Sequence, residues 1–380
     1  MEKIKVLFVN HRLVWGGAER ALFDLICLLD KEKFDVTLFV QSDEGSWDGK
    51  FRDAGIRVIY DYSCREATFN PVKKLGNIVK KYRTAEAYKR DGEGLLDVVF
   101  PEGADIVISY SVWDNEELVF APNAKTVKYY HGDPGTNPIY REEALKTLDR
   151  LKRFDKIVCV SQAACDSFVE LTGMQETVEM HFNPMDSDSV KELSKVEVDF
   201  PEGDNVVCAV GRLSEEKGFD RLIYIHRNLL QQGIYHKLLI VGDGPDRKRL
   251  ENTIRATKTQ DTVILAGYQS NPYPYMAKCK FLVSSSFTEG LPVISMEALC
   301  LGTPIVSAVP SIGEAFGEEV CGLITENDND SLEAGIKKML TDPDFYAQAK
   351  AGAQKRGTYF DGKRMVREIE DMLLELVSKQ

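Results

Sequence analysis

The stretch KVLFVNHRLVWGGAERALFDLICLLDKEKFDVTLFV (residues 5–40) sets the pattern of the whole chain. It begins with the apolar run KVLFVN (5–10), continues with the amphipathic segment ALFDLICLLD (21–30) and ends with a second apolar run, DVTLFV (35–40). Apolar runs of strand length that alternate with amphipathic segments are typical of β-α-β units, which form a parallel sheet covered by helices on both faces. We therefore predict an α/β fold.

The same alternation fills two long parts of the chain. The further strand-like runs are ADIVISY (104–110), AKTVKYY (124–130), KIVCVS (156–161), NVVCAVG (205–211), HKLLIVGDG (236–244), DTVILAGY (261–268), KFLVSSS (280–286) and TPIVSAV (303–309). They predict two doubly wound, Rossmann-like domains, over residues 1–183 and 205–359, joined by a polar linker at 184–204. The closing segment 360–380 has helical apolar spacing, and the sequence leaves open whether that helix packs back on the first domain.

Composition excludes several classes of protein. The chain of 380 residues has a formal net charge of -12, which argues against general nucleic-acid binding, so an anionic ligand must meet a local basic patch. Its eight cysteines form no CxxC pair and are expected to be reduced core residues. The apolar run near the first residue is too short for a signal peptide or a spanning helix, and we predict a cytoplasmic location.

The segment VGRLSEEKGFDRLI (210–223) places two cations where a strand ends and a helix begins. Arg212 and Lys217 lie on the loop, flanked by Gly211 and Gly218. Fixed cations beside a helix N-terminus can hold a diphosphate, because charge-assisted hydrogen bonds and backbone donors converge there. Two solvated charges on an ordinary strand-to-helix loop remain the alternative.

The segment SSSFTEGLPVISMEALCLGTPIV (284–306) predicts a buried helix over residues 292–301, because its positions are apolar nearly all round. Glu297 is the one charge in that helix and should have a hydrogen-bonding partner, for which a ribose diol would be suitable. Glu289 lies in the turn before the helix, beside backbone donors that can meet an anion. The alternative is a capping acid and a core glutamate paired with a protein group.

Together these motifs give the sequence a family resemblance. Glu289 and Glu297, separated by seven residues, together with GRLSEEKG (211–218), GGAER (16–20) and Asn183-Pro184, resemble the retaining GT-B glycosyltransferases of family GT4. The resemblance spans nearly the whole chain. It implies two Rossmann-like domains that face each other across a cleft, and transfer of a sugar from a nucleotide-sugar donor to a hydroxyl by front-face displacement.

The resemblance also implies roles for individual residues. Arg212 and Lys217 would hold the donor diphosphate and stabilise the leaving nucleotide without a metal, Glu289 would bind hydroxyls of the transferred sugar, Glu297 would bind the ribose, and His131 would contact the donor sugar. The remaining donor-binding positions would be Gly16, Gly17, Gly211, Gly242, Gly244, Gly267, Tyr268, Gly290, Leu291 and Pro292. For the glycines, tight strand-to-helix turns are an equal alternative, and for His131 the alternative is a structural histidine.

Signals for the acceptor and for a metal are weak. Asp133, Trp113 and Asp114 are acceptor candidates because they follow strands of the N-terminal domain. We expect no cofactor and no metal. Three Asp-x-Asp matches, Asp186/Asp188, Asp328/Asp330 and Asp342/Asp344, lie in the linker and in polar loops, and we reject them as metal sites.

The segment 71–90 is basic within an acidic protein and has apolar residues at helical spacing. It permits two interpretations: peripheral docking on the anionic inner face of a membrane, toward a lipid-linked acceptor, or a solvated helix packed on the sheet, which we favour.

The sequence leaves the sugar, nucleotide and acceptor open, and we favour a UDP-sugar and a glycan, glycolipid or polysaccharide acceptor. Alternatives are an epimerase or phosphorylase on the same architecture and a sugar-nucleotide-binding protein without turnover. A nicotinamide-dependent oxidoreductase fits the strand pattern but lacks the glycine fingerprint.

Overall fold

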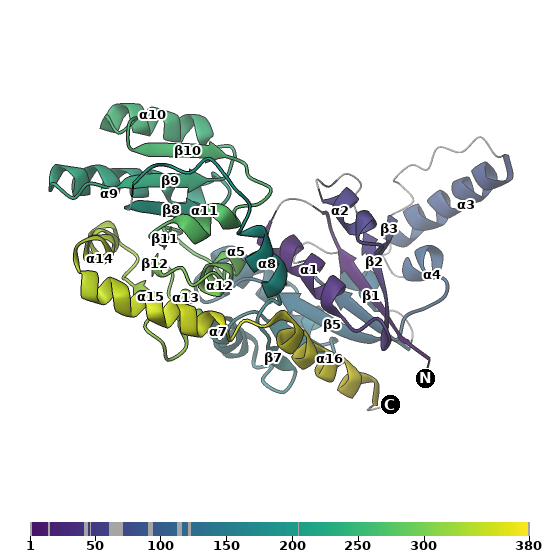
Figure 1. Ribbon diagram of the computed structural model, residues 1–380. Helices are drawn as coiled ribbons and strands as arrows, with labels where there is room; N and C mark the ends of the chain where they lie inside the picture. Colours follow the sequence, from purple (N-terminus) through teal and green to yellow (C-terminus); the bar gives the residue numbers. More distant parts are fainter. Residues whose placement is uncertain are drawn as a thin grey trace. The chain divides into compact units, whose positions relative to one another are not determined.

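The structure is a computed structural model that describes residues 2–13, 16–41, 45, 47–60, 71–89, 94–111, 116–120, 123–203 and 205–378 (Figure 1). The chain divides into two compact units, which we describe separately. Unit 1 consists of residues 1–184 and 363–380, and unit 2 consists of residues 185–362. Each unit is built on a parallel sheet, so the predicted pair of doubly wound α/β domains is confirmed.

The sheet of unit 1 has seven parallel strands within the described residues, in the order β3-β2-β1-β4-β5-β6-β7. The strands are β1 (Ile4–Asn10), β2 (Phe34–Val40), β3 (Arg57–Tyr60), β4 (Ile106–Ser109), β5 (Lys125–Tyr130), β6 (Lys156–Cys159) and β7 (Val178–Met180). The strand order reverses direction between β1 and β4, and ligands of open α/β sheets bind at the carboxyl ends of strands beside such a reversal.

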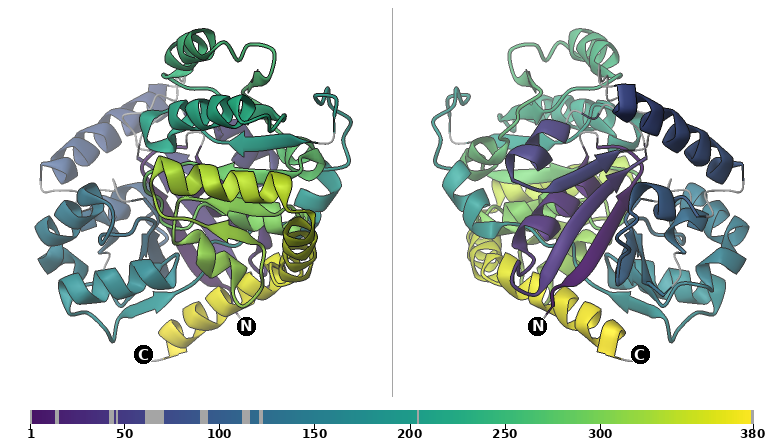
Figure 2. Two further views of the ribbon diagram at one scale, coloured as in Figure 1. Left: turned by 90° about the vertical axis from the view of Figure 1, so that its left-hand side faces the viewer. Right: turned by 90° about the vertical axis from the view of Figure 1, so that its right-hand side faces the viewer.

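Helices cover both faces of this sheet. The helices of unit 1 are α1 (Gly17–Leu28), α2 (Asp48–Asp53), α3 (Pro71–Tyr88), α4 (Leu96–Val99), the 3-10 helix η1 (Glu116–Val119), α5 (Pro138–Lys146), α6 (Leu148–Leu151), α7 (Gln162–Thr172) and α16 (Gly362–Ser378). One core cluster joins the sheet to α1 and α16, and another joins it to α4, α5 and α7. Figures 1 and 2 show α3 extending outward, away from the sheet of its unit.

The closing helix α16 packs on unit 1, although its residues follow those of unit 2 in the chain. Its apolar face lies in the same core cluster as β1, β2 and α1. Glu370 on this helix is buried, and its carboxylate accepts hydrogen bonds from Asp30 N at 2.7 Å and from Lys33 Nζ at 3.3 Å. The last helix therefore belongs to the fold of the first part of the chain.

The sheet of unit 2 has six parallel strands within the described residues, in the order β10-β9-β8-β11-β12-β13. The strands are β8 (Val206–Val210), β9 (Lys237–Val241), β10 (Val263–Gly267), β11 (Phe281–Ser284), β12 (Ile305–Ser307) and β13 (Gly322–Ile324). The reversal lies between β8 and β11, which are neighbours in the sheet. The loops that follow these two strands therefore leave the sheet at the same edge, side by side.

The helices of unit 2 are α8 (Ser187–Leu193), the 3-10 helix η2 (Glu215–Lys217), α9 (Phe219–Gln231), α10 (Arg247–Thr257), α11 (Tyr273–Lys278), α12 (Val293–Cys300), α13 (Ile312–Phe316), α14 (Asn329–Thr341) and α15 (Pro343–Gly357). Helix α8 lies inside the segment predicted as a linker. Asn271 Nδ2 donates to the carbonyl of Leu193 at the end of α8, at 2.8 Å, and α8 packs on α11 and α12. Helix α8 is therefore part of unit 2, although the sequence predicted a linker there.

Candidate functional site

The loops after β8 and β11 meet in an ion pair. Lys217, the last residue of η2, pairs through Nζ with Oε1 of Glu289, and the side chain of Ser286 donates to the same oxygen at 2.8 Å. Both charged side chains are partly buried, with 24% of Lys217 and 18% of Glu289 exposed. The topology thus brings together two residues that are 72 positions apart in the sequence.

Arg212 lies on the same loop as Lys217 and pairs with a different acid. Its Nη2 contacts Oε1 of Glu216 at 2.8 Å, and Ser214 Oγ donates to that oxygen at 2.7 Å. Partial burial acts to raise the pKa of Glu216, but the hydrogen bonds from Arg212 and Ser214 outweigh it and lower this pKa to about 2. Glu216 is therefore ionised at neutral pH, and both cations of this loop are paired with carboxylates.

Glu289 lies a few residues before α12, a helix that is buried along nearly its whole length. Gly290, Leu291 and Pro292 connect the two, and Pro292 is the N-cap rather than the first helical residue that the sequence predicted. The positive end of a helix dipole favours negative groups nearby. The turn that contains Glu289 is therefore placed where an anion would be stabilised.

Glu297 lies within α12 and is 5% exposed. The hydroxyl of Tyr273, in α11, donates to its Oε1 at 2.7 Å. Tyr273 thus supplies a hydrogen bond to the carboxylate that the sequence required to be partnered. The expected bond to a ribose is a separate proposal.

Two of the candidate glycines have structural reasons of their own. A Cβ on Gly242, whose φ is +145°, would lie 1.8 Å from the carbonyl oxygen of Gly211, and a Cβ on Gly244 would lie 2.4 Å from that of Leu213. The loops after β8 and β9 therefore pack backbone to backbone at these positions. Gly267 accepts a hydrogen bond from Gly242 N at 2.9 Å, and Tyr268 after it is exposed.

In unit 1, His131 lies at the end of β5. Its Nε2 contacts the carbonyl oxygen of Tyr110 at 2.8 Å, and since a carbonyl only accepts, Nε2 carries the proton. Nδ1 is buried and has no hydrogen-bond partner among the described residues. Burial lowers the pKa of His131 to about 4, helped by the charge of Lys128 and opposed by the Tyr110 carbonyl. The ring is therefore neutral at pH 7 and offers an acceptor nitrogen.

Asp133 organises the turn that follows His131. Its carboxylate accepts hydrogen bonds from Gly135 N at 2.7 Å and from Thr136 Oγ1 at 3.1 Å. The hydrogen bond that orients the ring of His131 comes from the Tyr110 carbonyl and not from Asp133. Trp113 and Asp114 lie outside the described residues.

Gly16 and Gly17 begin α1, also in unit 1. Gly16 is the N-cap of this helix and makes no side-chain cap bond. A Cβ on Gly16 would lie 2.4 Å from Oε2 of Glu19, whereas one on Gly17 would meet nothing within 4 Å. The end of the Glu19 side chain can move, so packing requires glycine at neither position, and both leave the backbone accessible.

The first aspartate of each Asp-x-Asp match caps a helix. Asp186 accepts from Ser189 N at 2.9 Å, Asp328 from Ser331 N at 2.8 Å, and Asp342 from Phe345 N at 2.9 Å. N-caps favour aspartate for this reason, so capping accounts for these motifs. Within the described part of the chain, no group of three or more His, Cys, Asp or Glu side chains is arranged to hold a metal ion.

Several contributors to this site were missed by sequence reasoning. Ser286 and Tyr273 bond the two glutamates, Glu216 pairs with Arg212, and Arg221 lies beneath the loop after β11. Arg221 gives only a weak signal, as a charged residue directly before the apolar pair Leu222 and Ile223. The serine and tyrosine give no comparable signal.

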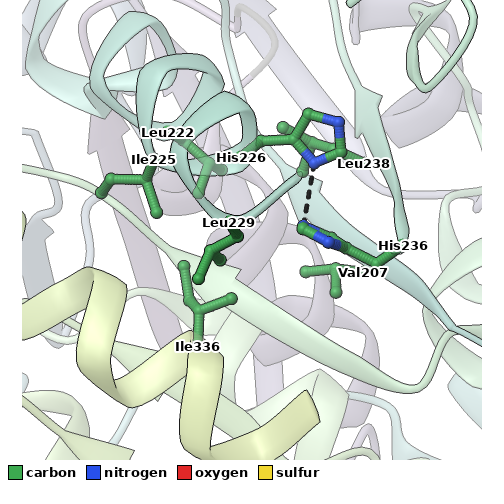
Figure 3. A pocket seen from close by; sticks show the side chains of 8 residues that line it. All are labelled: Val207, Leu222, Ile225, His226, Leu229, His236, Leu238 and Ile336. Atoms are coloured by element: carbon green, nitrogen blue, oxygen red, sulfur yellow. Dashed lines mark hydrogen bonds between the residues drawn. The ribbon is translucent and has the colours of Figure 1, made fainter. Parts of the chain in front are cut away.

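A second polar group lies in the interior of unit 2. His226 on α9 and His236 before β9 are buried against apolar side chains, and their Nδ1 and Nε2 atoms are 2.8 Å apart (Figure 3). His236 Nδ1 donates to the carbonyl of Ile234, so its Nε2 accepts from His226, whose own Nε2 accepts from Thr262 Oγ1 at 2.9 Å. These bonds use both nitrogens of each neutral ring, and we assign the pair a structural role.

Comparisons with known proteins agree on a class of enzyme. A family model for the glycosyl transferases group 1 matches residues 190–356. The chain is 26% identical to the N-acetylgalactosamine-N,N'-diacetylbacillosaminyl-diphospho-undecaprenol 4-alpha-N-acetylgalactosaminyltransferase of Campylobacter jejuni, over 98% of this chain and 100% of that protein. It is 29% identical to the lipopolysaccharide core biosynthesis glycosyltransferase LpsE of Rhizobium meliloti, over 77% and 75% of the two chains.

Solved structures share the fold at lower identity. Anabaena HepE in complex with UDP and glucose matches with a TM-score of 0.74 and 19% identity, covering 97% of this chain and 99% of that one. The pneumococcal O-GlcNAc transferase GtfA in complex with UDP and GlcNAc matches with a TM-score of 0.74 and 13% identity, covering 99% and 100%.

Proposed function

The chain belongs to the group 1 glycosyltransferases and has the GT-B fold, and from this premise we propose that it transfers a sugar, with retention of configuration, from a UDP-sugar to a hydroxyl of a glycan or lipid-linked acceptor. The observation on which the proposal rests is the meeting of Lys217 with Glu289, beside Arg212, at the carboxyl ends of β8 and β11. One short region thus offers cations for a diphosphate and a carboxylate for sugar hydroxyls.

The chemistry follows from these charges. The leaving nucleoside diphosphate gains negative charge in the transition state, and Lys217 and Arg212 would stabilise it there, so we propose that no metal is required. Glu289 would accept hydrogen bonds from hydroxyls of the transferred sugar. His131 would accept another at Nδ1, because its ring is neutral and that nitrogen has no described partner. The departing phosphate oxygen would take the proton of the acceptor hydroxyl.

Roles for the remaining candidates rest on the family resemblance. Glu297 would bind the ribose, and the backbone of Gly290 and Leu291 would meet the donor. We keep Asp133 as an acceptor candidate, because its carboxylate holds the turn that follows His131.

The donor and the acceptor are inferred from relatives. The matched structures of HepE and GtfA contain UDP, and the Campylobacter relative is named for transfer to a diphospho-undecaprenol-linked sugar. We therefore propose a UDP-sugar donor and a polyprenyl-diphosphate-linked or cell-surface glycan acceptor. The epimerase, phosphorylase and binding-protein alternatives are not favoured by the Campylobacter, Rhizobium and pneumococcal relatives, which are named for transfer.

A lipid-linked acceptor requires access to a membrane, and we propose that α3 provides it. Its Ile78, Val79 and Tyr82 are 58%, 52% and 71% exposed, and Lys81 and Arg83 beside them are exposed too. An amphipathic helix with basic flanks can bind anionic lipid. Among the described residues, no helix has the length and apolar composition needed to cross a bilayer.

Vesicle flotation tests the membrane contact. We expect binding to vesicles that contain phosphatidylglycerol, weak binding to phosphatidylcholine alone, and loss of binding when Lys73, Lys74, Lys80 and Lys81 are replaced by Gln. Unchanged flotation of this variant would leave α3 as an ordinary solvated helix.

The transfer reaction is tested in two steps. Melting temperatures are first measured with a panel of nucleoside diphosphates, since a ligand that binds the folded state raises the melting temperature. The sugar nucleotides of the best nucleotide are then incubated with lipid-linked acceptors, with and without EDTA, and the anomeric configuration of the product is read by NMR. We expect a UDP-dependent shift, a retained anomer and no effect of EDTA. A product formed without any acceptor would indicate the epimerase instead.

A further inference from the structure

Arg221 is a buried cation beneath the loop that contains Glu289. It lies in the first turn of α9 and is 7% exposed. Its Nε and Nη2 donate to the carbonyl oxygen of Ser285 at 2.9 and 2.6 Å, and Nη2 also donates to that of Ser286 at 3.0 Å. One guanidinium therefore holds two consecutive carbonyls.

Burying the Arg221 guanidinium costs free energy, because the charge loses its contacts with water. Among the described residues, Arg221 has no carboxylate within ion-pair distance, and Asp220 and Asp328 act on it only through longer-range attraction. Its guanidinium carbon lies 4.2 Å from the centroid of the Phe287 ring, which covers it. Loop carbonyls and one aromatic ring thus replace the water and the counter-ion.

The loop that Arg221 holds connects β11 to α12 and contains Glu289. Ser286, whose carbonyl accepts from Arg221, donates from its hydroxyl to Glu289, and Ser285 donates from its hydroxyl to the carbonyl of Lys217 at 2.8 Å. Phe287 N donates to the carbonyl of Glu216 at 2.9 Å. Each of the three residues before Thr288 is therefore fixed to a group near the Lys217–Glu289 pair.

The loops after β8 and β11 pack so closely at Gly218 that no side chain fits between them. A Cβ on Gly218, whose φ is +62°, would lie 2.3 Å from the carbonyl oxygen of Ser285 and 2.9 Å from Nε of Arg221. The glycine after Lys217 thus permits the contact between Arg221 and the carbonyls. Arginine suits this place because its planar fork reaches two acceptors while its face stacks on a ring.

We propose that Arg221 is a positioning residue for the transfer reaction: through the carbonyls of Ser285 and Ser286 it fixes the loop that presents Glu289 to the donor sugar. The inference rests on the proposed function. Arg221 has no polar contact of its own with Glu289, so its effect passes through Ser286. A displacement of about 1 Å at a group that binds the reacting sugar can lower turnover by about a hundredfold.

Unit 2 provides a matched control in Arg356. Its Nε donates to the carbonyl of Ala315 at 2.7 Å, and its guanidinium carbon lies 3.9 Å from the centroid of the Tyr359 ring. Arg356 resembles Arg221 in chemistry but holds a carbonyl of α13. Its replacement reports the general cost of losing a stacked, carbonyl-bound arginine.

The experiment compares Arg221→Gln, Arg221→Lys and Arg356→Gln with the wild-type protein. We expect Arg221→Gln to lower kcat at saturating donor by at least about tenfold while the melting shift induced by UDP persists. Arg221→Lys should recover part of the loss, and Arg356→Gln should keep kcat within about twofold of wild type even if it melts earlier. Equal kcat losses in Arg221→Gln and Arg356→Gln, or loss of the UDP-induced shift, would overturn the proposal.

A second measurement separates this inference from the proposed function. Amide hydrogen exchange in residues 285–291 should accelerate in Arg221→Gln and not in Arg356→Gln. A wild-type protein that transfers no sugar contradicts the proposed function, whereas unchanged exchange in an active Arg221→Gln contradicts the positioning role. If Arg221→Gln does not fold, Arg221→Lys and Ser286→Ala provide the same readouts, and wild-type kcat in both would overturn the proposal.

Discussion

Replacing Lys217 or Glu289 should lower turnover much more than it lowers the stability of the fold. We expect Lys217→Ala and Glu289→Ala each to lower turnover by at least about a hundredfold, because each removes a group that we propose acts on the charged or reacting part of the donor. The fold should persist, since Lys217→Ala leaves Glu289 bonded to Ser286 and partly exposed to water. Initial rates and melting curves check both statements. A variant that loses turnover only because it unfolds would contradict this prediction.

Glu216 competes for the cation that we assign to the diphosphate. Its carboxylate is ionised at neutral pH, with the pKa lowered to about 2, and it pairs with Arg212. We expect Glu216→Gln to bind UDP about two- to fivefold more tightly, a small gain because exposed ion pairs contribute no more than about 1 kcal/mol. Titration calorimetry measures the change.

Glu215→Gln is the control for that measurement, because it makes the same change of charge at the neighbouring, exposed position. An equal gain in affinity from Glu215→Gln would mean that the overall electrostatic potential of the loop, and not the pair between Glu216 and Arg212, sets the affinity for UDP.

At the scale of single residues, the sequence predicts the types of group at the site but not their partners. Arg212, Lys217, Glu289 and Glu297 could be proposed from charge, turn position and spacing along the chain. Their contacts with Ser286 and Tyr273 could not, because those contacts depend on which strands become neighbours in the sheet. Glu216 is next to Lys217 in the sequence, yet its pairing with Arg212 depends on the shape of the loop.

At the scale of elements, the paired histidines make unit 2 sensitive to acid. Burial lowers the pKa of His226 to about 3, with a further contribution from His236, whose pKa burial also lowers. The unfolded chain therefore binds more protons than the folded one between about pH 6.5 and pH 3. The free energy of unfolding contributed by the pair is complete above about pH 6.5, and is lost as the pH falls, by at most about 1.4 kcal/mol for each pH unit and histidine.

The test is the slope of stability against pH. We expect chemical unfolding of the wild-type protein between pH 7 and pH 4.5 to show a steeper loss of stability than unfolding of a His226→Phe/His236→Leu double variant. The difference in slope is informative even if the variant is less stable at pH 7, since the carboxylates that also titrate are the same in both proteins. Parallel slopes would show that the histidines do not titrate differently on unfolding.

Helices and strands could be predicted where the pattern of apolar residues in the sequence matches the burial of the element in the structure. The apolar runs identified strands of both sheets, and the all-apolar segment after Glu289 forms α12 as a buried helix. Helix α8 was missed because its segment is polar, and it is held by a cap from Asp186 and by bonds to residues 271 and 300, far along the chain. Such tertiary contacts produce no apolar periodicity in the sequence of a short segment, so they could not be predicted from it.

At the scale of the whole molecule, the path of the chain ties its last helix to its first unit. The amphipathic pattern of α16 predicted a helix but not its partner, because an apolar stripe fits either sheet equally well. In the structure Val366, Ile369 and Leu373 are buried in the core of unit 1. Unit 1 is thus assembled from two segments separated by the whole of unit 2, and its stability should depend on contacts made by the end of the chain.

Glu370 provides the sharpest test of that dependence. Glu370→Ala leaves the partly buried N–H of Asp30 without its acceptor and removes one of the two acidic partners of Lys33, which keeps its pair with Asp30. We expect a loss of up to about 1–3 kcal/mol, the cost of an unsatisfied buried donor. Glu368 lies on the same helix, is exposed and pairs with Arg364, so Glu368→Ala should change stability by less than about 0.5 kcal/mol. Urea unfolding followed by fluorescence measures both, and equal effects would mean that α16 contributes to unit 1 through its apolar stripe alone.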